Sequence, residues 1–154
     1  MDVDRIATRL NPWMIRILRS PLHPLLSSGL MLLSYTGRRS GRRIEIPVGY
    51  QRRGNTITVL ASRARRKQWW RNFSEPAAVE LLVRGRVLGG EARLVPGGSE
   101  AFRTAVESTF RRLPRLAGQF GLAYDRASGL TPDQFRQLAE EGAMVEIALR
   151  GEPR

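Results

Sequence analysis

The amino-acid sequence predicts an α+β fold with about six antiparallel strands, a helix before them and further helices inserted towards the end of the chain. Three observations predict this class. Short apolar runs alternate with glycine-bearing turns through residues 29–96, which is typical of strands joined in hairpins. Apolar residues at helical spacing occur before and after that stretch. Strands gathered early and helices placed late favour a small antiparallel barrel with helices around it.

The chain is expected to form a single domain over residues 1–154, because its length suits one core and 42% of its residues are hydrophobic. An N-terminal helix and its connection occupy residues 1–28, and the barrel core follows at 29–96. A helical part covers 97–142, and the last barrel strand lies in 143–150. Clusters of Pro, Gly and Ser separate these parts.

Residues 3–19 have the pattern of an amphipathic helix interrupted at Pro12. The apolar face predicts a helix packed over the domain, whereas Trp13 and nearby arginines at the edge of that face also suit a membrane surface. The interrupted apolar run at 22–33 is too short to span a bilayer, and the acidic start of the chain lacks the features of a signal peptide. A cytoplasmic protein is therefore expected, with peripheral membrane contact through residues 3–19 left open.

The expected strands are bounded by turns that contain glycine. Residues 37–41 form a turn with glycine at both ends. Arg53-Gly54-Asn55 and Arg84-Gly85-Arg86 have the composition of hairpin turns. The strands between and around these turns are Leu30–Thr36, Ile44–Tyr50, Ile57–Ala61, Val79–Val83, Val87–Val95 and, near the end of the chain, Met144–Leu149.

Three helices are expected after the first strands. Arg65–Phe73 is predicted to be one short helix, because a Ser-Glu-Pro breaker follows it. Ser99 caps a helix that runs to about Arg112. Thr131 caps the last helix, which has proline at its first helical position and ends at a glycine. The stretch at 114–129 shows no regular pattern.

Positive charge is concentrated in one part of the sequence. Residues 37–71 hold ten Arg and one Lys against the single acid Glu45, and the whole chain has a net charge of +12. This concentration predicts an anionic partner held at one place. Arginine also offers a planar fork that matches phosphate and carboxylate. A nucleic-acid-binding module is an alternative, disfavoured because the segment matches no standard reading helix or aromatic RNA-binding signature.

Cysteine is absent, and the single histidine, His23, lies between two prolines and is interpreted as a turn residue. The sequence therefore offers no recognisable zinc site, no Cys nucleophile and no Ser-His-Asp arrangement. No metal site is expected.

Three motifs are candidates for a binding site. The turn from Thr36 to Arg43 can aim backbone N–H groups and arginines at an anion, although a hairpin tip with solvated arginines has the same pattern. Ser62 and Arg63 follow a strand, where they either meet a ligand or form a polar strand end. In the third motif, residues 69–73, the first and last aromatic side chains share a helical face that suits the core, and Asn72 can satisfy backbone groups rather than a ligand.

In their order and spacing these motifs resemble the deazaflavin-dependent nitroreductase family, within the flavin-binding split-barrel proteins. The resemblance covers about a third of the chain, from Leu30 to Val83. Ile44 stands where the family often has a basic residue, and Ala64-Arg65 replaces a usual glycine pair. The motifs that carry the resemblance are Thr-Gly-Arg-Arg-Ser-Gly at 36–41, Pro47, Ala61-Ser62-Arg63, the aromatic pair with Asn72-Phe73, and Pro76 before the next strand.

The resemblance implies a split β-barrel that binds coenzyme F-420, a deazaflavin with a phosphate and a polyglutamate tail. It implies that Arg39 faces the tail or phosphate, that Pro47 lines the deazaflavin pocket, and that Ser62 lies beside the ring. Ser62 and Tyr124 are the candidate catalytic residues, because a hydroxyl can donate to an acceptor as charge develops. The full set of expected cofactor-binding residues is Arg38, Arg39, Arg42, Arg43, Pro47, Ser62, Arg63, Trp70 and Asn72.

The expected function is hydride transfer from reduced coenzyme F-420 to a small organic acceptor. The family suggests quinones, nitroaromatics and unsaturated carbonyl compounds as acceptors. The first alternative is a split-barrel protein that binds FMN or another small ligand, and the second is the nucleic-acid-binding module. A homodimer is left open, because barrels of this family often pair.

Overall fold

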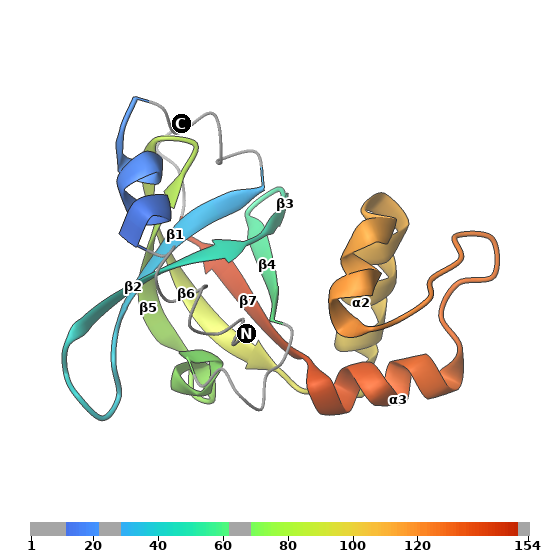
Figure 1. Cartoon of the computed structure of the whole chain (residues 1–154). Helices are drawn as coiled ribbons and strands as arrows, with labels where there is room; N and C mark the ends of the chain where they lie inside the picture. Colours follow the sequence, from blue (N-terminus) through green and yellow to red (C-terminus); the bar gives the residue numbers. More distant parts are fainter. Residues whose placement is uncertain (1–11, 22–28, 62–68, 151–154) are drawn as a thin grey trace, which may run out of the picture. The chain divides into compact units, whose positions relative to one another are not determined.

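The computed structural model describes residues 12–21, 29–61 and 69–150 (Figure 1). A helical segment at 12–19 precedes the first strand. The strands are β1 (Leu30–Thr36), β2 (Arg43–Gly49), β3 (Gln51–Arg53), β4 (Thr56–Ala61), β5 (Ala77–Val83), β6 (Arg86–Val95) and β7 (Ala143–Leu149). The helices are α2 (Glu100–Arg112), α3 (Pro132–Glu141) and two short 3-10 helices, η2 (Trp69–Phe73) and η3 (Pro114–Phe120).

The strands form one seven-stranded sheet in the order β2-β1-β5-β6-β7-β4-β3. The pairs β1–β2, β1–β5 and β5–β6 are antiparallel, and the predicted α+β class is confirmed. The expected strands lie within two residues of the observed ones at their ends. The additional strand is β3, whose three polar residues show none of the apolar alternation by which a strand is recognised in a sequence.

Two compact units make up the chain, and the single domain expected from the sequence stays a prediction. The first unit consists of residues 1–57, 77–92 and 147–154, and the second consists of 58–76 and 93–146. The strands β4, β6 and β7 contribute residues to both units.

In the first unit, β1 lies between β2 and β5 and is buried over most of its length. Ser34 of β1 lies opposite Glu45 of β2 and also opposite Glu80 of β5. Successive side chains of a strand point to opposite faces, so these three side chains share one face, which we call the outer face. The opposite, core face carries the buried residues Met31, Leu33, Tyr35, Val48, Val79, Leu81 and Val83.

The second unit contains the helical core. Both expected caps are observed: the Ser99 side chain accepts a hydrogen bond from the Phe102 amide at 3.2 Å, and Thr131 forms a capping box with Gln134. The stretch that appeared irregular in the sequence contains η3, which ends at Gly121 in the left-handed conformation with φ of 69°. A hydrophobic cluster joins the two helices, η3, the loop between η3 and α3, and one residue each from β6 and β7: Val95, Phe102, Val106, Phe110, Ala117, Phe120, Leu122, Leu130, Leu138 and Met144.

Two adjacent glycines of β6 test how closely β6 and β7 approach. A Cβ atom at Gly90 would lie 2.8 Å from Cγ2 of Ile147 and 2.9 Å from the carbonyl oxygen of Ala148, whereas a Cβ at Gly89 would have nothing within 4 Å. We therefore expect Gly90→Ala to lower the free energy of unfolding by about 1–3 kcal/mol, and Gly89→Ala to change it by less than about 0.5 kcal/mol. Urea denaturation measures both. Equal stability of the two variants would contradict the close approach of the strands.

Candidate functional site

The basic turn, residues 37–42, joins β1 to β2 within the first unit. The Gly37 amide donates a hydrogen bond to the Arg42 carbonyl, and the Gly41 amide donates one to the Gly37 carbonyl, both at 2.9 Å. Gly41 has a φ of 66°, which favours glycine. A Cβ atom at Gly37 would lie only 2.7 Å from Oγ of Ser40. The two glycines therefore allow a tight turn, as the sequence predicted.

Three of the six backbone amides of this turn donate within the turn itself. Besides the amides of Gly37 and Gly41, the Arg42 amide donates to Oγ of Ser40 at 3.2 Å. Arg38, Arg39 and Arg42 are exposed, which fits both interpretations left open by the sequence, an anion site and a solvated hairpin tip.

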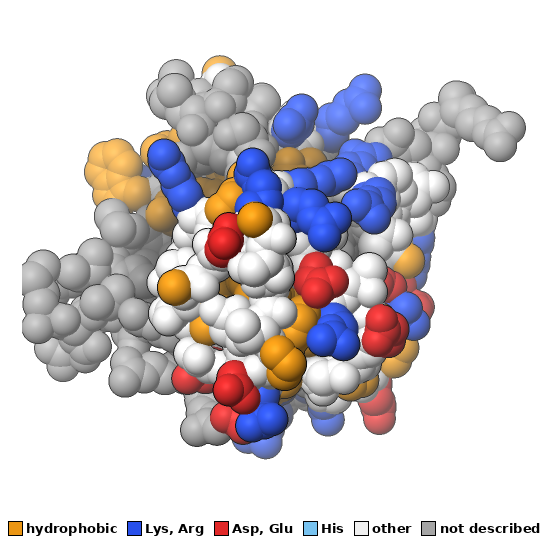
Figure 2. Space-filling model, turned by 90° about the vertical axis from the view of Figure 1, so that its right-hand side faces the viewer, with side chains coloured by type: hydrophobic (Ala, Val, Ile, Leu, Met, Phe, Trp, Pro, Cys, Tyr) orange, Lys and Arg blue, Asp and Glu red, His pale blue; other side chains and the backbone are white. Residues whose placement is uncertain are grey.

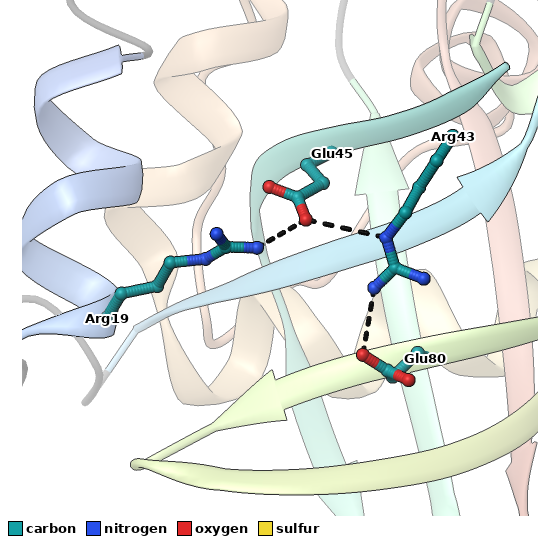
Figure 3. A network of polar contacts seen from close by, with 4 residues as sticks. All are labelled: Arg19, Arg43, Glu45 and Glu80. Carbon is teal, nitrogen blue, oxygen red and sulfur yellow. Dashed lines mark hydrogen bonds and ion pairs between the residues drawn. The ribbon is translucent and has the colours of Figure 1, made fainter.

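Arg43, the first residue of β2, belongs to a network of charges on the outer face (Figure 3). Its Nη2 donates to Oε1 of Glu80 at 2.9 Å, and its Nε lies 3.5 Å from Oε1 of Glu45. Arg19, at the end of the helical segment 12–19, also donates to Glu45. The hydrogen bond and the charge of Glu80, followed by those of Glu45, hold the pKa of Arg43 above its ordinary value. The charge of this predicted cofactor-binding residue is thus balanced on the protein.

Pro47 lies on the same face of β2 as Arg43 and Glu45, because the three residues are two apart along the strand. It is paired in register with Leu32 of β1 and is half-buried. The outer face therefore carries, in order from the basic turn, a cation, a carboxylate and the proline ring.

The third motif, in the second unit, forms η2. The rings of Trp69 and Phe73 meet edge to face with centroids 6.3 Å apart, and Phe73 is fully buried, which fits the expected core role of this pair. Nδ2 of Asn72 donates to the Trp69 carbonyl at 2.8 Å, so this amide satisfies a backbone group. The guanidinium of Arg71 lies 5.4 Å from the ring centroid of Trp70. Residues 62–68 lie outside the described residues, and with them Ser62, Arg63 and the first part of the expected helix.

Tyr124 is half-buried beside the hydrophobic cluster of the second unit, with its ring centroid 5.7 Å from that of Phe110. The predicted site residues are thus divided. Arg38, Arg39, Arg42, Arg43 and Pro47 lie together in the first unit, whereas Trp70, Asn72 and Tyr124 belong to the second.

Two residues of the outer-face network, Arg19 and Glu80, were not recognised in the sequence. Glu80 is an acid at an exposed position of an alternating strand, which is ordinary for a solvated face. Only the register of β5 on β1 shows that it lies beside Ser34 and within reach of Arg43. Glu80 could have been recognised from the two-residue period of its strand, if the strand that pairs with it had also been known.

Basic side chains are not confined to the turn. Figure 2 shows Lys and Arg side chains gathered along the upper edge of the face that it displays, with Asp and Glu side chains lower on that face. The last turn of α2 contributes exposed Arg111 and Arg112, and Arg115 follows in η3. Positive charge alone therefore does not identify one anion site. The arrangement of the basic side chains is needed to distinguish between the candidate sites.

Several solved structures resemble this fold. An F-420-H(2)-dependent reductase (FDR-A) is 15% identical, covers 77% of this chain and 93% of its own, and has a TM-score of 0.54. A protein described as a domain-swapped dimer is 16% identical, covers 90% of this chain and 95% of its own, and has a TM-score of 0.56. HutZ, the haem storage protein from Vibrio cholerae, is 13% identical, covers 90% of this chain and 89% of its own, and has a TM-score of 0.52. At these identities the likeness shows the fold, which is the predicted split barrel.

No curated protein sequence matches the chain. The model of the F-420H(2)-dependent quinone reductase family matches residues 7–111, which is more than half of the chain. The match includes the basic turn, Pro47 and η2, and it ends before Tyr124. It confirms the resemblance to deazaflavin-dependent reductases and identifies an oxidoreductase whose cofactor is coenzyme F-420. The chain therefore belongs to the F-420H(2)-dependent quinone reductase family.

Proposed function

We propose that the protein transfers a hydride from reduced coenzyme F-420 to a small organic acceptor, with quinones as the first class to test. Nitroaromatics and unsaturated carbonyl compounds are further candidates. The observation that carries the proposal is the set of exposed arginines on one tight turn inside the stretch that matches the family. Among the described residues, Arg39 and Arg42 form no ion pair that would balance their charge.

The residues of the first unit fit an anionic deazaflavin. Arg38, Arg39 and Arg42 offer guanidinium groups, which bind phosphate and carboxylate through paired hydrogen bonds. Pro47 offers a half-buried apolar ring for the deazaflavin. When bound, the coenzyme supplies the hydride, so the protein needs to bind it, orient it and admit the acceptor.

For the second unit, we propose roles for the remaining expected residues within that unit alone. Trp70 would contribute an aromatic face, and Asn72 would shape η2 through its bond to the Trp69 carbonyl. Ser62 and Arg63 keep their proposed places beside the ring and the phosphate. Tyr124, or Ser62, would donate a hydrogen bond to the acceptor oxygen as negative charge develops there.

The role of the basic turn predicts which arginine matters for binding. Arg39→Ala should weaken binding of oxidised coenzyme F-420 about 10- to 100-fold, because one charge-assisted pair with the anionic tail is lost. Arg136→Ala on α3 is the matched control, since it removes the same charge from an exposed position outside the matched stretch. Fluorescence titration measures both variants, with FMN titrated in parallel. Equal affinities of the two variants would remove the turn from the cofactor site.

The proposed hydrogen bond to the acceptor makes a separate prediction. Tyr124→Phe should lower kcat with a soluble naphthoquinone about 100-fold while leaving the affinity for coenzyme F-420 unchanged. Ser62→Ala tests the other candidate in the same way. Steady-state turnover with each variant decides between them. If both variants keep the wild-type kcat, neither hydroxyl has the proposed role.

We propose peripheral membrane contact through residues 3–19 as an accompanying property, of which residues 3–11 lie outside the described residues. Trp13 is 67% exposed and lies one turn before the exposed Arg16, as suits a lipid interface. No described helix has the length and apolar character needed to cross a bilayer. We expect co-sedimentation with anionic vesicles to fall at least about tenfold in Trp13→Ala. Wild-type protein that stays in the supernatant would rule out this contact.

A homodimer stays a prediction for this chain. The fold neighbour described as a domain-swapped dimer supports it, although the likeness to that neighbour is one of fold. Sedimentation equilibrium of the full chain would measure the assembly, and a monomer at micromolar concentration would contradict the prediction.

A further inference from the structure

We propose that Glu80, Glu45 and Arg43 are positioning residues that hold the basic turn in place for the anionic tail of the coenzyme. They would thereby set the preference for tailed coenzyme F-420 over the same deazaflavin chromophore without phosphate and glutamates. The proposal rests on the proposed function of the turn. It assigns roles to two acids, which do not themselves bind anions.

The hairpin that carries the turn extends beyond the sheet that supports it (Figure 1). The register of β1 with β2 runs along both strands, from Leu30 with Gly49 to Thr36 with Arg43. The register of β1 with β5 ends at Ser34, which is paired with Glu80. Beyond that pair the hairpin is a two-stranded ribbon, and such ribbons twist strongly and are only marginally stable by themselves.

The ion pair between Arg43 and Glu80 ties this ribbon to the third strand. Arg43 begins β2 opposite Thr36, which is the last register pair before the turn. Its side chain reaches past β1, which lies between β2 and β5, to Oε1 of Glu80 at 2.9 Å (Figure 3). Glu45 holds the same guanidinium at Nε, 3.5 Å away. Two carboxylates therefore fix the direction of one side chain at the base of the turn.

Movement of Arg43 would pass directly to the basic turn. Arg42 is its neighbour in the chain and is held twice, through its carbonyl by the Gly37 amide and through its amide by Ser40. The positions of Arg38 and Arg39, between these contacts, depend on the same short loop. Fixing Arg43 thus restricts the loop that presents all three exposed arginines.

The exposure of these groups argues against a role in overall stability. The Arg43 and Glu80 side chains are 56% and 49% exposed, and ion pairs of such exposure contribute little to the free energy of unfolding. They do, however, limit the orientations of the groups that they join. The network therefore suits local positioning better than stabilisation of the whole fold.

Glu80→Gln separates positioning from simple electrostatics, because the two predict opposite changes in the affinity for the anionic coenzyme. The variant removes a negative charge near the turn, so electrostatics alone would tighten the binding of an anion. Positioning predicts weaker binding, although the net charge near the turn becomes more positive. Glu91→Gln is the matched control: Glu91 lies on β6 in the first unit, is exposed and is in no ion pair with Arg43.

The experiment is fluorescence titration of full-length wild-type protein and variants with oxidised coenzyme F-420 and with the tail-less chromophore. We expect Glu80→Gln to weaken coenzyme F-420 binding on the order of tenfold and to leave tail-less binding unchanged, with Glu91→Gln at or above wild-type affinity. Glu80→Asp should restore part of the loss. In an Arg43→Gln background, Glu80→Gln should have no further effect, because the two residues act as one unit.

A second measurement does not need the coenzyme. Amide hydrogen exchange at Gly37 and Gly41, whose N–H groups close the turn, should become faster in Glu80→Gln and remain unchanged in Glu91→Gln. Thermal unfolding of each variant shows whether the whole fold is affected.

Three results would overturn the positioning role. They are unchanged or tighter coenzyme binding in Glu80→Gln, an equal loss for the tailed and tail-less ligands, and unchanged exchange at the turn. If Arg39→Ala weakens binding while Glu80→Gln does not, the positioning role falls and the proposed function stands. If neither the wild type nor any variant binds coenzyme F-420, the proposed function itself fails.

Discussion

The antiparallel register of β1 between β2 and β5 is the constraint on which the outer face depends. Strand β1 is paired along both of its edges and is buried over most of its length. The register assigns every residue of the three strands to one of two faces. A shift by one residue would move Arg43, Glu45 and Pro47 to the core face and bring Ile44 and Ile46 out. The hydrophobic core of the first unit and its charged network are therefore two consequences of one pairing.

Basic residues outnumber acidic residues in this protein, and a few of the acids pair with arginines at defined positions. Among the described residues, the acids of the first unit that pair with arginines lie on β2 and β5, beside the base of the basic turn. Glu45 pairs with two guanidinium groups, those of Arg19 and Arg43. Arg43 is paired with acids of the protein, whereas Arg39 is exposed and is the residue that we propose for the coenzyme.

The expected site residues fall into two groups, one in each unit. The basic turn and Pro47 come from one hairpin, whereas η2 and Tyr124 come from the second unit. Each group has local support: glycines and a serine in the turn, an edge-to-face aromatic pair in η2, and the ring of Phe110 beside Tyr124. The family match covers the basic turn, Pro47 and η2, and it ends before Tyr124.

The sequence by itself determined the features whose cause is local. The caps at Ser99 and Thr131, the glycine turn and strand β1 were predicted because side-chain oxygens, glycine and a short apolar run act over a few residues. The order of motifs also identified the family. Strand β3 and helix η3 were missed, because a short polar strand and a 3-10 helix depend on the neighbours that they pair or pack with.

Only the tertiary structure decided that Arg43 pairs with acids on two strands. Sequence reasoning grouped Arg38, Arg39, Arg42 and Arg43 as equivalent cations of one motif. The register of β5 on β1 places Glu80 within reach of Arg43, across a separation of 37 residues. No local pattern specifies such a pair, because it is set by the pairing of strands that are far apart in the chain and by the twist of the sheet that carries them.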